Sequence, residues 1–184
     1  MVTKVQWTAS DLELMPHDDK RYEIIDGELL VTRAPHLGHQ DVCGEIFYYL
    51  KVWSKKSDSG KVAITPGVIF TEADNVIPDI VWIEKSRVDS IVDESGHLIE
   101  APDLAIEIIS PGVENQRRDR NLKLKLYSAQ GVKEYWIADW QQKKIEIYRR
   151  TSAQLTLQAT LYEGDTITSP LLPDFCCAVD LLFV

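Results

Sequence analysis

The sequence contains few cysteines, and their arrangement excludes two kinds of site. Its 184 residues include only Cys43, Cys176 and Cys177. An odd number with one adjacent pair forms no disulfide framework and lacks the C-x-x-C spacing of zinc sites. We therefore expect buried free thiols, as is typical of proteins in a reducing compartment.

Long apolar runs are missing as well. No stretch approaches the roughly 20 apolar residues that a membrane-spanning helix needs. The first residues lack the apolar core of a signal peptide. We therefore expect a cytoplasmic protein that has no membrane segment.

Several motifs of well-known enzyme classes are absent. The sequence has neither the G-x-x-x-x-G-K-[ST] phosphate loop nor G-x-G-x-x-G, so it carries no nucleotide-binding fingerprint. It also lacks the G-x-S-x-G elbow of serine hydrolases. The histidines do not follow the His-x-x-x-His spacing of a zinc site; they are His17, His36, His39 and His97.

Positive charge is scarce. Against 29 acidic residues stand 20 lysines and arginines, giving a net charge of −9. This argues against a protein that coats nucleic acid through its overall field, although it allows a local basic patch beside an acidic metal site. Arg117, Arg118 and Arg120 are candidates for such a patch, because phosphates are contacted mainly by arginine and lysine. A solvated helix face explains the same cluster equally well.

What the sequence does contain is typical of one globular domain spanning residues 1–184, with 45% hydrophobic and 27% charged residues. Apolar periodicity predicts helices, and β-rich runs flanking Asp26-Gly27 predict a hairpin. The expected helices cover residues 10–15, 36–56, 86–93 and 116–130. The expected strands cover residues 21–31, 61–70, 77–83, 103–109, 134–139, 144–150 and 155–161. Residues 175–183 are expected to form edge strands or a closing helix. The order of helix, three strands, helix and strand indicates an α/β fold with a mixed sheet.

Two acidic residues interrupt apolar strands. Glu107 lies between Ile106 and Ile108, and Asp79 lies in a similar run. A buried carboxylate is costly unless its charge is compensated. Asp103 shares a strand face with Glu107, but at ~3.3 Å per residue it is about 13 Å away, too far to share a metal ion. If their strands are neighbours, Asp79 and Glu107 can bind one Mg²⁺ together. The alternative for Glu107 is a solvent-facing or arginine-paired edge residue.

The following helix supplies a cation. Asp119, Lys123, Leu126 and Tyr127 share one helical face, so Lys123 borders the apolar stripe. Pointing inward, its ammonium could orient an attacking water or stabilise charge on a reacting phosphate. The alternative is an ordinary surface lysine.

These residues together resemble the PD-(D/E)xK phosphodiesterase superfamily, and more closely a bacterial family of restriction endonucleases. The resemblance runs from Tyr22 to about Arg150. The matching motifs are Tyr22 to Glu28, His39, Pro78-Asp79, Ile106 to Pro111, Asp119 with Lys123 and Tyr127, and Gly131 to Asp139. One departure is that Ile109 stands where the superfamily motif has its lysine. In the resembled family this lysine moves to the next helix, which corresponds to Lys123.

The resemblance implies a restriction-endonuclease-like core over about residues 36–150, with an added N-terminal hairpin and C-terminal strands. It implies a Mg²⁺- or Mn²⁺-dependent endonuclease that acts on DNA as a homodimer. The metal ligands would be Asp79, Glu107 and the main-chain carbonyl of Ile108, and Lys123 would be catalytic. Glu23, His39 and Asp119 match supporting positions; Glu23 could equally be an ordinary hairpin carboxylate and His39 a first-turn polar residue. The alternative function is a non-catalytic assembly or regulatory module that keeps the nuclease fold.

Overall fold

The computed structural model describes residues 5–16 and 18–183. The helices are α1 (Ala9–Leu12), α2 (Leu37–Ser57), α3 (Val88–Ile91), α4 (Val113–Arg117) and α5 (Leu124–Gln130), with a π-helical turn at Arg118–Lys123 and 3₁₀ turns at Lys85–Arg87 and Val179–Leu182. The strands are β1 (Arg21–Ile25), β2 (Glu28–Thr32), β3 (Gly60–Ile64), β4 (Val68–Thr71), β5 (Asp74–Val76), β6 (Ile80–Glu84), β7 (Leu104–Ile108), β8 (Glu134–Asp139), β9 (Lys144–Thr151), β10 (Gln154–Tyr162), β11 (Thr166–Ser169) and β12 (Leu172–Ala178). No helix of the described chain is long and apolar enough to span a membrane.

A mixed six-stranded sheet forms the centre of the molecule. Its strand order is β10-β9-β8-β7-β6-β3, and only the central β7–β8 pair is parallel. The parallel pair is linked by the chain that carries α4 and α5, as a parallel connection requires. β6, β7 and β8 are almost fully buried, which explains their continuous apolar runs.

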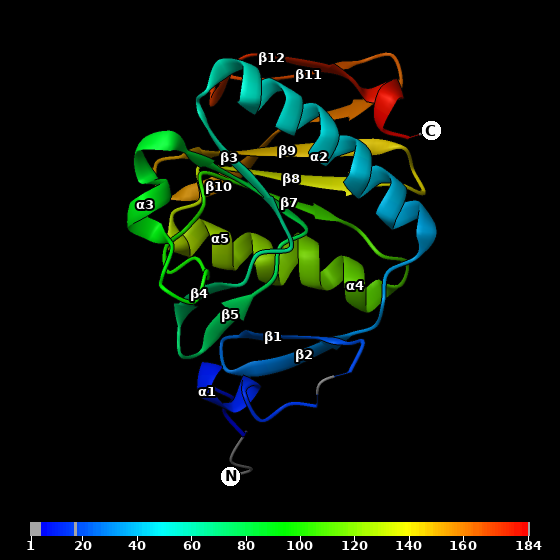
Figure 1. Ribbon diagram of the computed structural model, residues 1–184. Helices are drawn as coiled ribbons and strands as arrows, with labels where there is room; N and C mark the ends of the chain where they lie inside the picture. Colours follow the sequence, from blue (N-terminus) through cyan, green and yellow to red (C-terminus); the bar gives the residue numbers. More distant parts are fainter. Residues whose placement is uncertain (1–4, 17, 184) are drawn as a thin grey trace.

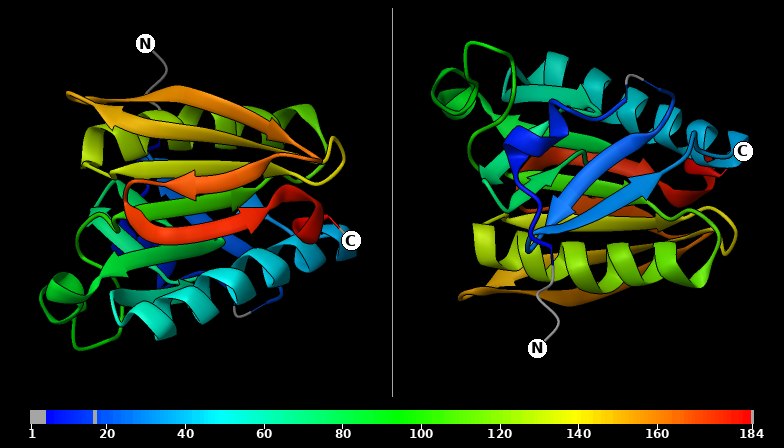
Figure 2. Two further views of the ribbon diagram at one scale, coloured as in Figure 1. Left: turned by 90° about the horizontal axis from the view of Figure 1, so that it is seen from above. Right: turned by 90° about the horizontal axis from the view of Figure 1, so that it is seen from below.

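The two faces of this sheet are covered by different elements (Figures 1 and 2). The long helix α2 and the β11–β12 hairpin lie on one face, where Ile46, Leu50, Trp136 and Phe175 pack together. The α4–α5 segment covers the other face, together with a small four-stranded sheet of order β2-β1-β5-β4. Burial on both faces gives the central strands their stability.

The small sheet begins with the predicted hairpin. Asp26 and Gly27 have φ values of 53° and 69°, and β1 and β2 pair in antiparallel register around them. This is the conformation that Asp-Gly turns favour. β5 then joins β1 through Ile24 and Asn75, which brings two segments together that lie far apart in the sequence.

Several predicted elements need correction. The expected strand 61–70 is two strands in different sheets, separated near Thr65, whose φ is 47°, and Pro66. The expected strand 77–83 begins only at Ile80, so Asp79 lies directly before β6 rather than within a strand. The C-terminal segment forms a hairpin, and its first strand, β11, was not expected.

The helix expected over residues 116–130 begins earlier, at Val113, and contains the π-helical turn. Its end is as expected, because Gly131 adopts a φ of 95° directly after α5. The prediction of buried thiols is confirmed for Cys43 and Cys177 and wrong for Cys176, which is exposed.

Candidate active site

Strands β6 and β7 bring the two anomalous acids together. They pair antiparallel with Ile80 opposite Ile106, so one further step along the register places Asp79 opposite Glu107. The main-chain N–H of Ile108 donates a hydrogen bond of 2.9 Å to Asp79 Oδ2. The expectation that these two acids are brought together by neighbouring strands is therefore confirmed, although Asp79 lies one residue before the start of β6.

Asp79 is buried and held by two cationic or hydrogen-bonding side chains. Arg21 Nη1 donates to Asp79 Oδ1 at 2.9 Å, and His39 Nε2 lies 3.1 Å from Oδ2. Burial alone raises the pKa of Asp79, but the hydrogen bond and charge of His39 and the Ile108 N–H outweigh it. The net pKa of Asp79 is lowered, so this carboxylate is ionised at neutral pH.

Lys123 points inward and joins two carboxylates. Its Nζ lies 2.8 Å from Glu23 Oε1 and 2.9 Å from Glu107 Oε1, and the side chain is 2% exposed. Tyr127 Oη donates a further bond of 2.8 Å to Glu107 Oε1. Glu23 Oε1 also accepts the main-chain N–H of Ile77 at 2.7 Å. Glu23 is therefore part of the acidic cluster rather than an ordinary hairpin carboxylate.

The same cluster shifts the pKa of its members. Burial raises the pKa of Glu107 to about 8; the positive charge of Lys123 opposes this, and the negative charge of Asp79 adds to it. For Lys123 burial lowers the pKa, but the charges of Glu107 and Glu23 outweigh it and the net pKa is raised. Lys123 therefore carries a positive charge at neutral pH.

The π-helical turn places Lys123 where it can reach these acids. Asp119 and Lys123 are both buried within this turn, and Tyr127 follows on α5. A π turn contains one more residue per turn than an α-helix, and such turns often occur at functional sites. The predicted face of Asp119, Lys123 and Tyr127 is confirmed, although the local helix type was not expected.

Asp119 acts on the site through its neighbour. Arg118 Nε and Nη2 donate to the two Asp119 carboxylate oxygens at 2.8 and 3.0 Å. Arg118 borders the cavity described below, whereas Asp119 lies behind it. Asp119 thus fixes the direction of the Arg118 guanidinium.

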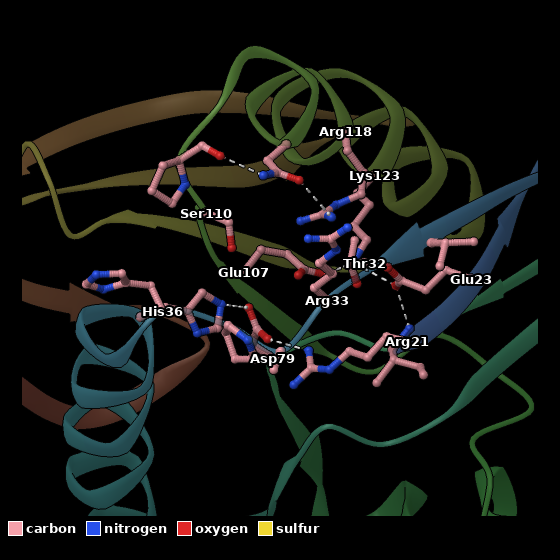
Figure 3. A pocket seen from close by; sticks show the side chains of 17 residues that line it. Arg21, Glu23, Thr32, Arg33, His36, Asp79, Glu107, Ser110, Arg118 and Lys123 are labelled. Carbon is pink, nitrogen blue, oxygen red and sulfur yellow. Dashed lines mark hydrogen bonds and ion pairs between the residues drawn. The ribbon is translucent and has the colours of Figure 1, made fainter. Parts of the chain in front are cut away.

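These side chains surround a cavity of about 320 Å³ (Figure 3). Asp79, Glu107, Lys123, Glu23 and His39 all line it. Sequence reasoning missed other polar residues of its wall, namely Arg21, Arg33, Asn115 and Ser110. Strand alternation could have found Arg21, because it shares a face of β1 with Glu23. Arg33 follows β2 in an irregular segment, where no periodicity indicates direction.

Comparisons with known proteins identify the family of this chain. Residues 9–180 match the model of the Uma2 family, described as "Putative restriction endonuclease". The chain belongs to this family. A comparison with curated proteins finds no match.

A solved structure supports the fold of this Uma2 chain. It is similar to the crystal structure of "a putative nuclease belonging to DUF820" from Anabaena variabilis ATCC 29413, with a TM-score of 0.75. The two sequences are 18% identical, and the match covers 96% of this chain and 97% of the other. The expected mixed α/β fold is therefore confirmed.

Most of the other residues considered from the sequence lie away from the cavity of this Uma2 protein. Asp103 pairs with Lys133 at 2.7 Å and with Arg87 at 2.8 Å, and it does not line the cavity. The three arginines predicted to bind nucleic acid do not form one surface. Arg120 is held by Glu146 and Asp139, Arg117 is exposed beside Glu114, and only Arg118 faces the cavity.

The donor set fits a hard divalent cation such as the one that the resemblance implies. The described residues contain no group of three or more His, Cys, Asp or Glu arranged to enclose a metal ion. Mg²⁺, however, is usually held by one or two carboxylates together with waters and substrate phosphates. Asp79 and Glu107 supply two such carboxylates on one cavity wall. The role of the Ile108 carbonyl stays a prediction.

Proposed function

We propose that this Uma2 protein is a metal-dependent endonuclease that hydrolyses phosphodiester bonds in DNA. One observation carries the proposal: Asp79, Glu107 and Lys123 reach a single cavity from three separate parts of the chain. Hydrolysis of a phosphodiester requires that the negative charge of the phosphate be neutralised and that further charge in the transition state be stabilised. Two carboxylates that can hold a metal ion, with an ammonium beside them, supply both functions. Family membership agrees with this reaction class.

Each residue has a distinct proposed part. Asp79 and Glu107 would hold one Mg²⁺ or Mn²⁺ ion between them. When bound, such an ion polarises the phosphate and lowers the pKa of a coordinated water. The Lys123 ammonium offsets negative charge that develops on the phosphate. His39 lowers the pKa of Asp79 and, together with Arg21, fixes the direction of its carboxylate, and the Tyr127 hydroxyl fixes the direction of Glu107.

Cleavage of plasmid DNA in Mg²⁺ or Mn²⁺ tests the proposal. Asp79→Asn and Glu107→Gln should each lower the cleavage rate at least about 100-fold, because each removes a charged group from the reacting centre. Asp89→Asn is a matched control, since Asp89 is exposed and lies outside the cavity. Circular dichroism shows whether each variant folds. Cleavage at the wild-type rate in both Asp79→Asn and Glu107→Gln would contradict the assignment.

A second function is favoured by the ion pairs themselves. Lys123 already neutralises Glu23 and Glu107, and Arg21 pairs with Asp79, so the acids are satisfied without a metal. We infer the alternative of a non-catalytic assembly or regulatory module from these contacts. Calorimetric titration with Mn²⁺ separates the two functions: absence of binding favours the module, and binding that is lost in Glu107→Gln favours the enzyme.

A further inference from the structure

The segment of residues 33–36 runs along the cavity between strand β2 and helix α2. All four of its residues line the cavity (Figure 3). Pro35 restricts the backbone at the centre of the segment, and His36 begins α2 in an extended conformation with φ −64° and ψ 151°. The segment therefore presents its two polar side chains, Arg33 and His36, from a stiff backbone.

Arg33 differs from the other arginines of the cavity because its guanidinium pairs with no acidic side chain in the described part of the chain. It is exposed and makes no hydrogen bond or ion pair with any other residue in the described part of the chain. The other arginines and the lysine of the cavity wall pair with acids: Arg21 with Asp79, Arg118 with Asp119, and Lys123 with Glu23 and Glu107. Arg33 is thus a free cation at a cavity proposed to receive a phosphodiester.

The imidazole of His36 is held in place on two sides. It stacks on the indole of Trp140 with ring centroids 4.7 Å apart and an interplanar angle of 12°. Its Nδ1 accepts the main-chain N–H of Gly38 at 3.0 Å. Gly38 itself leaves room for the indole, because a Cβ there would lie 2.7 Å from Trp140 Cε3. Stacking and hydrogen bonding thus preorganise an exposed aromatic ring at the cavity rim.

We propose that residues 33–36 recognise the substrate strand. The Arg33 guanidinium binds a backbone phosphate, and the ring of His36 receives the base of a neighbouring nucleotide. The two residues are at most about 11 Å apart along an extended backbone, so both can contact one short stretch of strand. Inside a duplex both faces of a base are covered by its neighbours. The site therefore favours a strand with an unpaired or terminal nucleotide.

This inference rests on the proposed function and gives it a substrate class. Arginine forks bind phosphate oxygens through two parallel hydrogen bonds. Aromatic side chains stack on any base, since every base has a π face, and so they hold single strands without reading sequence. The net charge of −9 agrees with recognition by a few placed groups rather than by a broad basic surface.

Binding of a fluorescein-labelled single-stranded DNA decamer tests the Arg33 contact. Anisotropy is measured with Ca²⁺ in place of Mg²⁺, over a series of salt concentrations. Arg33→Ala should weaken binding roughly 10-fold and reduce the slope of log K against log salt by about 0.7, the value for one phosphate contact on a single strand. Arg33→Lys should recover the slope but not the full affinity.

Lys55→Ala is the matched control. It also removes one positive charge, but Lys55 is exposed near the far end of α2, about 28 Å from His36 along the helix axis at 1.5 Å per residue. Its affinity and salt slope should match the wild type. If Arg33→Ala behaves like Lys55→Ala, or if the wild-type protein does not bind the decamer, the inference is overturned.

A decamer containing 2-aminopurine tests the His36 contact, because this base loses fluorescence when it stacks on an aromatic ring. The wild type and His36→Phe should quench it, whereas His36→Ala should not and should bind roughly 5- to 150-fold more weakly. A blunt duplex of the same sequence should bind more weakly than the single strand. Equal quenching by His36→Ala, or a preference for the blunt duplex, would overturn the base contact.

The two proposals fail in different ways. Decamer binding with the expected Arg33 and His36 effects, but without cleavage in Mg²⁺ or Mn²⁺, would contradict the endonuclease and leave strand recognition standing. Cleavage that depends on Asp79 and Glu107, with Arg33→Ala equal to Lys55→Ala, would support the endonuclease and overturn strand recognition.

Discussion

At the residue scale, the direction of Lys123 determines what the acidic pair can do. Helical phase placed this lysine at the border of the apolar stripe and left both directions open. The structure turns it inward because two carboxylates, Glu23 and Glu107, meet its ammonium there. Glu107 was identified from its apolar flanks. The contact with Glu23 depends on a hairpin 100 positions earlier, at residue 23 against residue 123, and no local pattern reports such a contact.

Replacement of Lys123 should therefore destabilise the fold. Lys123→Met removes the cation and leaves Glu23 and Glu107 buried without its charge, which typically costs about 3–5 kcal/mol. Lys125→Met is the control, because Lys125 lies on the exposed side of the same helix. Urea denaturation measures the free energy of unfolding of both variants. Equal free energies of unfolding for the two variants would show that the buried ion pairs contribute nothing.

The raised pKa of Glu107 predicts how stability varies with pH. Its ordinary pKa is 4.5, and burial raises the folded-state pKa to about 8. Between these values the folded state retains a proton that the unfolded state releases, so the free energy of unfolding falls as pH rises. The lowered pKa of Asp79 acts only at pH below 3.8, outside this window.

Urea denaturation at about pH 5 and about pH 8.5 measures this dependence. Glu107→Gln cannot titrate, so its stability should fall less over that interval than that of the wild type. Some slope should remain, because burial also raises the pKa of Asp119. An unchanged slope in Glu107→Gln would mean that Glu107 is ionised throughout the window.

At the scale of single elements, the π-helical turn is the feature that sequence periodicity describes least well. Periodicity assumes 3.6 residues per turn, and the turn at Arg118–Lys123 contains one residue more. The prediction that Lys123 and Tyr127 share one helical face is nevertheless correct, because both lie near α5, where regular α-helical geometry resumes. The neighbouring arginines do not share one surface for the same reason, since the turn sends Arg118 toward the cavity and Arg120 toward Glu146.

Deletion of Asn121 should convert this turn to α-helix. Residues before the deletion would rotate by about 100° relative to α5. α4 would be the part that turns, because it has no buried residues to hold it, whereas Leu126 and Tyr127 anchor α5. Arg118 should leave the cavity while the helix content is kept.

Circular dichroism and plasmid cleavage together check this outcome. We expect near wild-type helicity with cleavage lowered at least about 10-fold, since the cavity loses a placed guanidinium. Asn121→Ala keeps the chain length and changes only an exposed side chain, so it should behave as the wild type. A deletion variant that cleaves at the wild-type rate would contradict a functional role for the π-helical turn.

At the scale of the whole molecule, the central sheet was predictable and the second sheet was not. Apolar runs and alternation in the sequence predict β7, β8 and β9, and the predicted bounds agree with the structure within a residue or two. The small sheet depends on the pairing of Ile24 with Asn75. Such a contact is non-local, and the short strands β4 and β5 have too few residues to show a period.

The homodimer implied by the resemblance remains a prediction, and it suits the proposed endonuclease because one cavity hydrolyses one strand and a duplex has two. If the protein cuts both strands of a duplex, sedimentation velocity of the protein alone should show a species of twice the 21.0 kDa chain mass. A protein that remains a monomer at every concentration while it linearises plasmid in a single event would contradict this expectation.

The cavity draws its wall from both sheets, and this has a consequence for refolding. Glu23 comes from the small sheet, Glu107 from the central sheet and Lys123 from the helix between β7 and β8. Contacts between distant segments form slowly, because the intervening chain must first be ordered. After dilution from denaturant, the far-ultraviolet signal of the helices should recover before the cavity closes. Recovery of the DNA cleavage proposed above would then lag behind recovery of secondary structure, and its time course would report the docking of one sheet on the other.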